Sequence, residues 1–175
     1  MIMITDILKY YIFIFSRKNN VRTACILFNN SFLSKRKRYN ILRQAGLSVN
    51  PESTIIDPFY FEQGNITLSG KVFINANCVF LDAGDIVIGH NTAIGPNVVL
   101  TTVSHPVQPE KRPKETICVP IHIGNNVWIG ANTTVLPGVS IGDNSVIAAN
   151  SVVNKNIPPN TLYAGSPVVF KKYLT

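Results

Sequence analysis

The chain has 175 residues, of which 46% are hydrophobic and 14% are charged, and its formal net charge is +7. This length predicts one main domain, and the apolar composition argues against an intrinsically disordered chain. The excess of basic residues is compatible with an anionic partner, such as a nucleic acid, a phosphorylated cofactor or a membrane surface.

Residues 1–46 form a basic, apolar N-terminal segment in which we expect two or three short helices, at about 5–16, 20–29 and 34–45. Gly46 suits the residue just after a helix, because glycine tolerates the left-handed backbone needed there. The segment carries nine of the 16 Lys and Arg residues against a single acid. The positive charge is therefore concentrated at one end of the chain.

The apolar run 7–15 is too short to span a bilayer, which takes about 20 residues. It precedes Arg17 and Lys18 without a small-residue cleavage site, so a signal peptide is not expected. We interpret the charge run 35–38 first as a solvated helix face. The alternative is that residues 1–46 rest on an anionic membrane surface. No nucleic-acid-binding motif accompanies the run, so no nucleic acid is expected as a partner.

Cys25, Cys78 and Cys118 are widely spaced and form no CxxC pair. An odd, scattered set of cysteines indicates reduced thiols, as is usual in the cytoplasm. The expected location is therefore cytoplasmic, with the inner face of the membrane as the alternative. Cys78 falls at an inward position of the pattern described next, which predicts a small core residue rather than a reactive thiol.

A repeat of six residues organises the following part of the chain, residues 47–160. Its aliphatic positions are Ile88, Ile94, Leu100, Ile123, Ile129, Val135, Ile141, Ile147 and Val153. A period of six is neither that of a helix nor that of a plain strand, and it is a signature of parallel β-helices. An antiparallel meander is the alternative, but its turns would be spaced less regularly, at about 8–12 residues.

The first coils are expected to point Ile55, Ile66 and Val72 inward. The repeat is then interrupted at about 103–120, where the stretch VSHPVQPEKRPKETICVP carries four prolines and five charges and has no period. Long loops of this kind are usually functional or disordered, and this one contains His105. Residues 161–175 form a C-terminal tail, for which we expect a strand or a short helix.

The hexapeptide run, the loop that begins with HP, the coils NNVWIG and LPGVSIGDNSVI and the ending VVNKNIPPNTLYAGSPVVFKK resemble the hexapeptide-repeat acetyltransferases. The stretches PFYF, GNITLSG and FINANCVFLD resemble the branch that acetylates maltose, galactosides, nodulation factors, O-antigens and capsules. The resemblance covers about residues 55–172. It implies an all-β fold, a single-stranded left-handed parallel β-helix with a short helical N-terminal segment and one long excluded loop.

The resemblance also implies a homotrimer, acetyl-CoA as co-substrate, a sugar or glycan acceptor and no metal. Each active site would lie in the groove between two columns. His105 is implied as the general base, since imidazole titrates near neutral pH. Its second nitrogen would be held by an acceptor that the sequence does not identify. The backbone N–H of Ala131 would stabilise the oxyanion. Relatives often have Ser there, so a hydroxyl is missing in this chain.

Three residues are implied to bind the acceptor. Asn75 matches an asparagine that contacts the acceptor sugar, and its amide can both donate and accept hydrogen bonds. The branch carries an acid upstream, and Glu62 is the only acid near that position, slightly out of register with it. Asp82 is interpreted in two ways, as a group that orients acceptor hydroxyls or as the cap of a turn. Ala83 stands where the branch has a further acid, which suggests an acceptor other than a galactoside. The basic, apolar N-terminal segment favours a glycan or a lipid-linked intermediate, which is consistent with an O-antigen or capsule-type acceptor.

Coenzyme A would lie along the groove, past Trp128 and the backbone N–H groups of Ala131 and Ala149. Lys155 and Lys172 match basic positions that meet the phosphates of the coenzyme, where lysine acts as a point charge. The alternative for Lys155 is an exposed surface lysine, and Trp128 also suits a contact within the trimer.

Other activities remain as alternatives. A serine O-acetyltransferase usually has an Asp just before the loop histidine, where this chain has Ser104, and a nucleotide-sugar N-acetyltransferase is a further option. A zinc γ-type carbonic anhydrase needs three converging histidines, whereas His90 and His122 sit at corners of the repeat. A non-enzymatic β-helix scaffold would not need His105.

Overall fold

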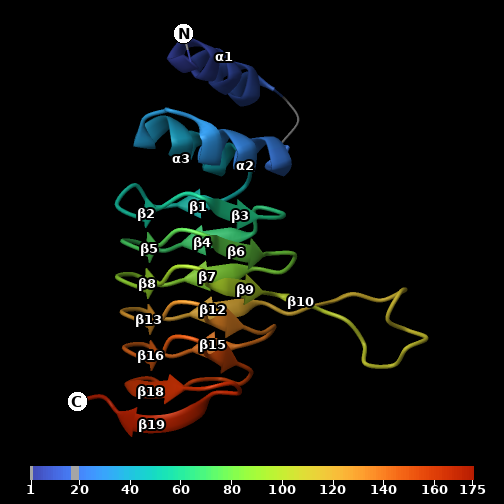
Figure 1. Cartoon of the computed structure of the whole chain (residues 1–175), viewed down its shortest axis with the longest axis vertical. Helices are drawn as coiled ribbons and strands as arrows, with labels where there is room; N and C mark the ends of the chain where they lie inside the picture. Colours follow the sequence, from blue (N-terminus) through green and yellow to red (C-terminus); the bar gives the residue numbers. More distant parts are fainter. Residues whose placement is uncertain (1, 17–19) are drawn as a thin grey trace.

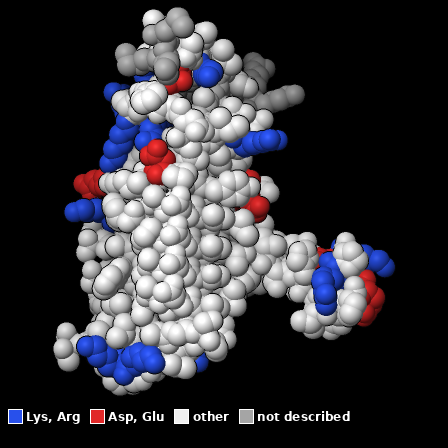
Figure 2. Space-filling view, viewed as in Figure 1, with Lys and Arg blue, Asp and Glu red and all other residues white. Residues whose placement is uncertain are grey.

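The computed structural model describes residues 2–16 and 20–175. A long column of short strands carries helices on one end, and the chain runs from the helices to the other end (Figure 1). Arg17 and Lys18 lie outside the described residues. On the face shown in Figure 2, Lys and Arg gather at the two ends and on the projecting loop, while most of the column between is uncharged.

The helices are α1 (Ile2–Phe15), α2 (Val21–Asn30) and α3 (Lys35–Gln44), which confirms the three predicted helices. Asn20 caps α2, since its side chain accepts the Thr23 N–H at 3.1 Å. Gly46 has a φ of 110° and ends α3 as predicted. The N–H groups of Gly46 and Leu47 turn back to the carbonyls of Arg43 and Leu42, which satisfies the last carbonyls of the helix.

The column has three faces, which we call A, B and C. Face A contains β1 (Ser48–Val49), β4 (Ile66–Leu68), β7 (Ile86–Ile88), β12 (Ile121–Ile123) and β15 (Ser140–Ile141). Face B contains β2 (Thr54–Ile55), β5 (Phe73–Ile74), β8 (Ala93–Ile94), β13 (Trp128–Ile129), β16 (Val146–Ile147), β18 (Thr161–Ala164) and β19 (Val169–Tyr173). Face C contains β3 (Phe59–Phe61), β6 (Cys78–Leu81), β9 (Val99–Thr101), β14 (Thr134–Val135) and β17 (Val152–Val153).

Each coil visits faces A, B and C in turn, and strands of successive coils pair in parallel. The aliphatic positions of the sixfold repeat stack inside the column. Each of the nine predicted residues is at most 3% exposed. Ile55, Ile66 and Val72 are also buried, as predicted. The fold is thus the predicted left-handed parallel β-helix.

Asparagines form many of the corners between faces. Asn77, Asn91, Asn97, Asn126, Asn132, Asn144 and Asn150 all have φ between 53° and 63°. Asparagine tolerates this left-handed backbone better than most residues. At the corner between faces A and B, Asn126 donates to Asn144 at 3.0 Å and Asn144 to Asn160 at 2.8 Å. The side-chain ladder therefore fixes the stacking of the coils.

The excluded loop leaves the column after face C and forms an arm, defined here as residues 103–120. Its ends pair as the antiparallel strands β10 (Val103–Ser104) and β11 (Ile117–Cys118). Figure 1 shows the arm projecting sideways from the column. The C-terminal tail folds as an antiparallel pair, because β19 returns alongside β18 at the base of face B.

Candidate active site

His105 follows β10 near the base of the arm, and its side chain is exposed. Its Nδ1 atom lies 3.0 Å from the backbone carbonyl oxygen of Glu115 across the arm. Because a carbonyl oxygen only accepts, the hydrogen of the neutral imidazole is on Nδ1, and Nε2 keeps its lone pair. A ring held in this tautomer can take a proton at Nε2, as a general base must.

The turn of the arm is tied together beside this histidine. The guanidinium of Arg112 donates from Nη2 to the carbonyl of Val107 at 2.6 Å and from Nε to that of Pro106 at 3.4 Å. His105 and Arg112 also line a shallow hollow on the arm. The arm therefore presents the imidazole from a hydrogen-bonded turn rather than from an irregular loop.

The backbone N–H groups of Ala131 and Ala149 lie at the corner between faces B and C, in successive coils. Neither forms a hydrogen bond within the described part of the chain. At the corner between faces A and B, by contrast, the N–H of His90 donates to Asn125 at 2.9 Å and that of Asn125 to Asp143 at 2.7 Å. The corner between faces B and C therefore offers donors that a ligand can use.

Asn75 lies at the same corner, two coils closer to the helices, because β5, β8 and β13 pair in register. Its Oδ1 accepts the N–H of Ala76 at 2.8 Å. The left-handed corner position of this coil belongs to Asn77, whose φ is 63°. Asn75 is therefore not the left-handed residue of the corner, and its half-buried side chain belongs to the edge that carries the free amides.

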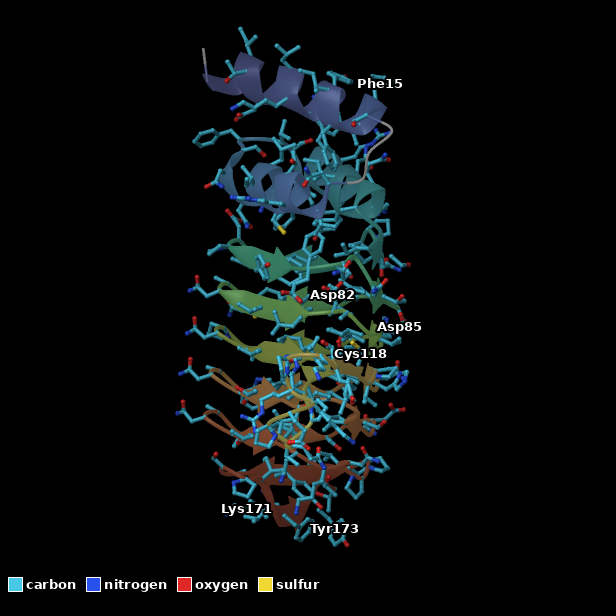
Figure 3. All side chains as sticks on the ribbon, turned by 90° about the vertical axis from the view of Figure 1, so that its right-hand side faces the viewer. Phe15, Asp82, Asp85, Cys118, Lys171 and Tyr173 are labelled. Carbon is cyan, nitrogen blue, oxygen red and sulfur yellow. The ribbon has the colours of Figure 1, made fainter. Side chains whose placement is uncertain are left out.

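The carboxylate of Asp82 caps a turn, which is the second of its two interpretations. Its side chain is 0% exposed. Oδ1 accepts the N–H groups of Glu62 and Gln63 at 2.7 and 3.0 Å, and Oδ2 those of Gly64 and Asn65, both at 2.7 Å. Figure 3 shows Asp82 against the upper coils. A carboxylate enclosed in this way cannot reach an acceptor, so its expected role in acceptor binding is corrected.

Glu62 follows β3 and begins the corner between faces C and A. This is the edge from which the arm also leaves, because β3, β6 and β9 pair in register. The half-buried Glu62 lines a cleft between α2 and β3, together with Arg22, Asn29, Tyr60 and other residues. The structure therefore places Glu62 on the same edge as His105, beside polar side chains that a hydroxylated ligand could contact.

The remaining predicted residues lie along face B and near the end of the column. Trp128 is 59% exposed on β13, and Lys172 is exposed on β19 of the same face. Lys155 is exposed two residues after β17. Within one chain, these residues and the corner amides are not brought together with His105, because the arm and the strands of face B lie on opposite sides of the column (Figure 1).

Comparisons with known proteins agree with the observed fold. The family described as bacterial transferase hexapeptide (six repeats) matches residues 120–155. The galactoside O-acetyltransferase of Escherichia coli (strain K12) is 42% identical over 83% of this chain and 73% of that protein. The structure of a galactoside acetyltransferase in complex with coenzyme A is 39% identical, with a TM-score of 0.82, over 89% of this chain and 79% of that chain.

A hexapeptide-repeat acetyltransferase from Vibrio cholerae, solved with acetyl coenzyme A, is also 39% identical, with a TM-score of 0.84. The alignment covers 89% of this chain and 85% of that one. The chain belongs to the hexapeptide-repeat acetyltransferases. As a member of this family it is an acyltransferase, and the predicted family and enzyme class are confirmed.

One functional feature of this acetyltransferase was not found from its sequence. The partner of His105 Nδ1 is a backbone carbonyl, ten residues away along the chain. Every residue has such a carbonyl, so no residue type signals the contact. The sequence indicated only that this long, Pro-rich loop is functional or disordered.

The other histidines of the acetyltransferase lie on the column, outside the arm. Nδ1 of His90 accepts the N–H of Lys71 at 3.4 Å, and His122 is exposed on β12 of face A. Among residues 2–16 and 20–175, no group of three or more His, Cys, Asp or Glu side chains is placed to hold a metal ion.

Two of the three thiols are part of the core. Burial raises the pKa of the Cys78 thiol to about 11, and burial also raises the pKa of Cys25. Cys78 Sγ lies 3.2 Å from the Gly95 carbonyl, to which it donates. This confirms Cys78 as a small core residue. Cys118 is exposed on β11 of the arm.

Proposed function

We propose that this acetyltransferase moves the acetyl group of acetyl-CoA to a hydroxyl of a sugar or polysaccharide precursor, with His105 as the general base. The observation that carries the proposal is the fixed tautomer of His105. Its Nδ1 is engaged by the Glu115 carbonyl at 3.0 Å, and its Nε2 is free on an exposed arm.

The proposed reaction is a direct attack. Nε2 of His105 takes the proton of the acceptor hydroxyl as its oxygen adds to the thioester carbonyl. The resulting tetrahedral intermediate carries an oxyanion, which fixed N–H donors stabilise. Its collapse breaks the carbon–sulfur bond, and the coenzyme thiolate leaves with the proton held by the imidazolium. Acetyl ester and free thiol are the products, and no side chain is acetylated.

The unpaired amides suit the other half of this chemistry. We assign the N–H of Ala131 to the oxyanion and that of Ala149 to the amide groups of the pantetheine arm. Both donors point out of a corner whose backbone is held by the neighbouring coils, so little reorganisation is needed when the charge develops. Trp128, Lys155 and Lys172 would bind the rest of the coenzyme, and Asn75 and Glu62 the acceptor.

The position of the two edges supports a site shared between subunits of a homotrimer. His105 and Glu62 lie at the corner between faces C and A, whereas Asn75 and Ala131 lie at the corner between faces B and C. One column cannot bring both edges to the same acetyl group. Two neighbouring columns can, if the edge of one faces the edge of the next, as a closed ring of identical contacts allows.

Each part of the chain has a place in this proposal. Residues 47–160 form the catalytic β-helix with its arm, residues 1–46 a cap and residues 161–175 a tail that extends face B. An O-antigen or capsule-type glycan is the proposed acceptor, because the basic, apolar segment 1–46 suits a glycan or lipid-linked intermediate and Ala83 stands where the resemblance implies an acid. A cytoplasmic location follows from the proposed use of acetyl-CoA.

Thiol release from acetyl-CoA tests the proposal directly. The purified protein should release thiol when sugars or glycan fragments are present, and an acetyl ester should appear in the product. L-serine, a nucleotide-linked amino sugar, and CO2 hydration with added zinc serve as parallel arms. Faster turnover in any of these arms than with all sugars would reject the sugar hydroxyl as the acceptor.

A further inference from the structure

Helix α1 exposes a continuous apolar stripe, defined here as Ile4, Leu8, Tyr11, Ile12 and Phe15. These side chains are 72%, 61%, 46%, 64% and 78% exposed, in that order. Their spacing of three, four and seven residues places them on one face of a helix. Soluble proteins rarely leave such a contiguous apolar surface uncovered, so the stripe indicates a binding partner.

The stripe points away from the rest of the molecule. The opposite face of α1 carries Tyr10 and Phe13, which are 6% and 4% exposed and pack on the helical core. Because 3.6 residues make one turn, the centre of the stripe lies roughly 180° around the helix from these two side chains. Figures 1 and 3 show α1 lying across the end of the column, with Phe15 at that outer end.

The charge of the chain is concentrated in the same cap. Residues 1–46 contain nine Lys and Arg and one acid, whereas residues 47–175 contain seven Lys and Arg and eight acids. The net charges are therefore +8 and −1. The single acid of the cap, Asp6, is 6% exposed, and its carboxylate accepts the N–H of Phe32 at 3.1 Å. The exposed surface of residues 1–46 therefore carries cations, and the one acid of this segment is buried.

Two of these cations flank the stripe. Lys37 on α3 holds its Nζ 5.6 Å from the ring centre of Tyr11, a member of the stripe, and 5.4 Å from that of Tyr10. Lys9 is exposed on α1 itself. A second copy of this cap would bring +8 against +8, so the charge pattern disfavours self-association through the stripe. It matches a negatively charged, apolar partner instead.

We propose that residues 1–46 form a membrane-docking cap. The stripe would enter the interface of an anionic bilayer while Lys9 and Lys37 meet lipid phosphates. No helix among the described residues is long and apolar enough to cross a membrane, so the helix would lie in the plane of the surface. The column would then stand on the bilayer by its helical end. The proposal does not depend on which acceptor the enzyme uses.

Vesicle co-sedimentation of the full chain tests the docking cap. The wild-type protein should bind vesicles of phosphatidylglycerol and phosphatidylcholine, bind pure phosphatidylcholine much less, and be released as salt screens the charges. Leu8→Ser/Ile12→Ser/Phe15→Ser should weaken binding by at least about a hundredfold, because three apolar side chains no longer leave water. Lys9→Gln/Lys37→Gln should weaken it by about tenfold or more.

Matched controls come from the arm, which the docking cap does not include. Val107→Ser removes another exposed apolar side chain, and Lys111→Gln/Lys114→Gln removes two exposed cations. Both controls should bind vesicles as the wild type does. Light scattering and thermal unfolding of every variant report assembly and folding. Absence of binding to anionic vesicles, or unchanged binding by the folded stripe variant, would overturn the proposal. A smaller oligomer in the stripe variant would also overturn it, because the stripe would then be a contact between two copies of the chain.

Discussion

The hydrogen bonds of single residues distinguish structural groups from groups that are available for chemistry. Both oxygens of Asp82 are occupied by four backbone N–H groups, and Nδ1 of His105 is occupied by one carbonyl. The Nε2 atom of His105 and the N–H groups of Ala131 and Ala149 remain free for a ligand. A site of this kind consists of the groups that the fold itself leaves unused.

His105→Ala should lower kcat by roughly 10²–10⁴, because the acceptor hydroxyl loses its general base. The thermal unfolding temperature and the oligomeric state should not change, since the side chain is exposed. Steady-state thiol release measures the effect. His122→Ala, which removes another exposed imidazole, is the matched control and should keep wild-type turnover. Equal losses in both variants would contradict the assigned role.

Asp82→Asn should lower the free energy of unfolding by about 2–3 kcal/mol or more, since buried N–H groups lose a charged acceptor. Urea unfolding measures this change. Glu110→Gln, an exposed acid on the arm, is the control and should leave stability unchanged. A variant that keeps its stability but raises the KM for the acceptor would restore the acceptor-binding interpretation of Asp82.

His105 could be singled out from the sequence as a candidate general base, whereas the orientation of its ring could not be predicted. A histidine inside a Pro-rich interruption of a regular repeat is a visible signal, and so is the Asn or Gly of each corner. The Glu115 carbonyl and the free amides of Ala131 and Ala149 carry no such signal, because backbone groups are the same in every residue. Asp82 shows the same limit, since a carboxylate suits either a cap or a ligand.

At the scale of elements, the close stacking of coils controls the position of the free amides. A Cβ atom at Gly130 would lie 2.5 Å from the backbone nitrogen of Ala149, and one at Gly95 would lie 2.7 Å from that of Ala131. Contacts this short require the backbone to move. Glycine at these corners therefore allows the close approach of successive coils, which sets the positions of the N–H groups of Ala131 and Ala149.

Gly130→Ala should destabilise the fold by about 1–3 kcal/mol, as overpacking usually does. It should also raise the KM for acetyl-CoA, because the amide of Ala149 is pushed out of place. Chemical unfolding and steady-state kinetics measure the two effects. Gly84→Ala is the matched control, since the nearest atom to its Cβ is a Thr102 carbon at 3.4 Å. Similar losses in both variants would contradict the role of the corner.

An ion pair joins the cap to the column. Arg38 of α3 lies 2.8 Å from the carboxylate of Asp57, which follows β2. Partial burial raises the pKa of Asp57, but the hydrogen bond and charge of Arg38 outweigh it and hold that pKa below its ordinary value. The carboxylate therefore contributes stability in its charged form.

Asp57→Asn should lower stability at neutral pH by about 0.2–1 kcal/mol, the range for partly exposed pairs. The unfolded pKa is about 3.9 and the folded one is lower, so the contribution is present above that range and lost as the pH falls through the folded pKa. Urea unfolding of both proteins at neutral and acid pH measures the difference. If the difference in free energy of unfolding between wild type and variant is the same at acid pH as at neutral pH, the ion pair is contradicted.

The elements themselves followed from local rules. The three helices and the coils could be predicted because their signals, a run of apolar residues and a sixfold repeat, can be recognised within a few neighbouring residues. The β10–β11 pair of the arm was not predicted, because its strands are two residues each and show no alternation. The pairing of β19 with β18 depends on contacts between segments of the tail that no local pattern encodes.

At the scale of the whole molecule, the two halves of the proposed site lie on different edges of one rigid column. The arm with His105 leaves the corner between faces C and A, and the amide of Ala131 lies at the corner between faces B and C. The closely packed coils do not bend enough to join these edges. In the proposed mechanism, catalysis therefore depends on how neighbouring columns assemble, and the cap at one end of the column leaves both edges free for such a contact.

Mixed trimers test this shared site most directly. His105→Ala and Ala131→Trp, which blocks the coenzyme corner, should each be inactive alone. When the two are unfolded and refolded together in equal amounts, about one quarter of the sites should combine an intact arm with an intact corner, so about one quarter of the wild-type activity should return. Mixed trimers that form, as shown by co-purification of two different tags, and yet remain inactive would contradict a site built from two subunits.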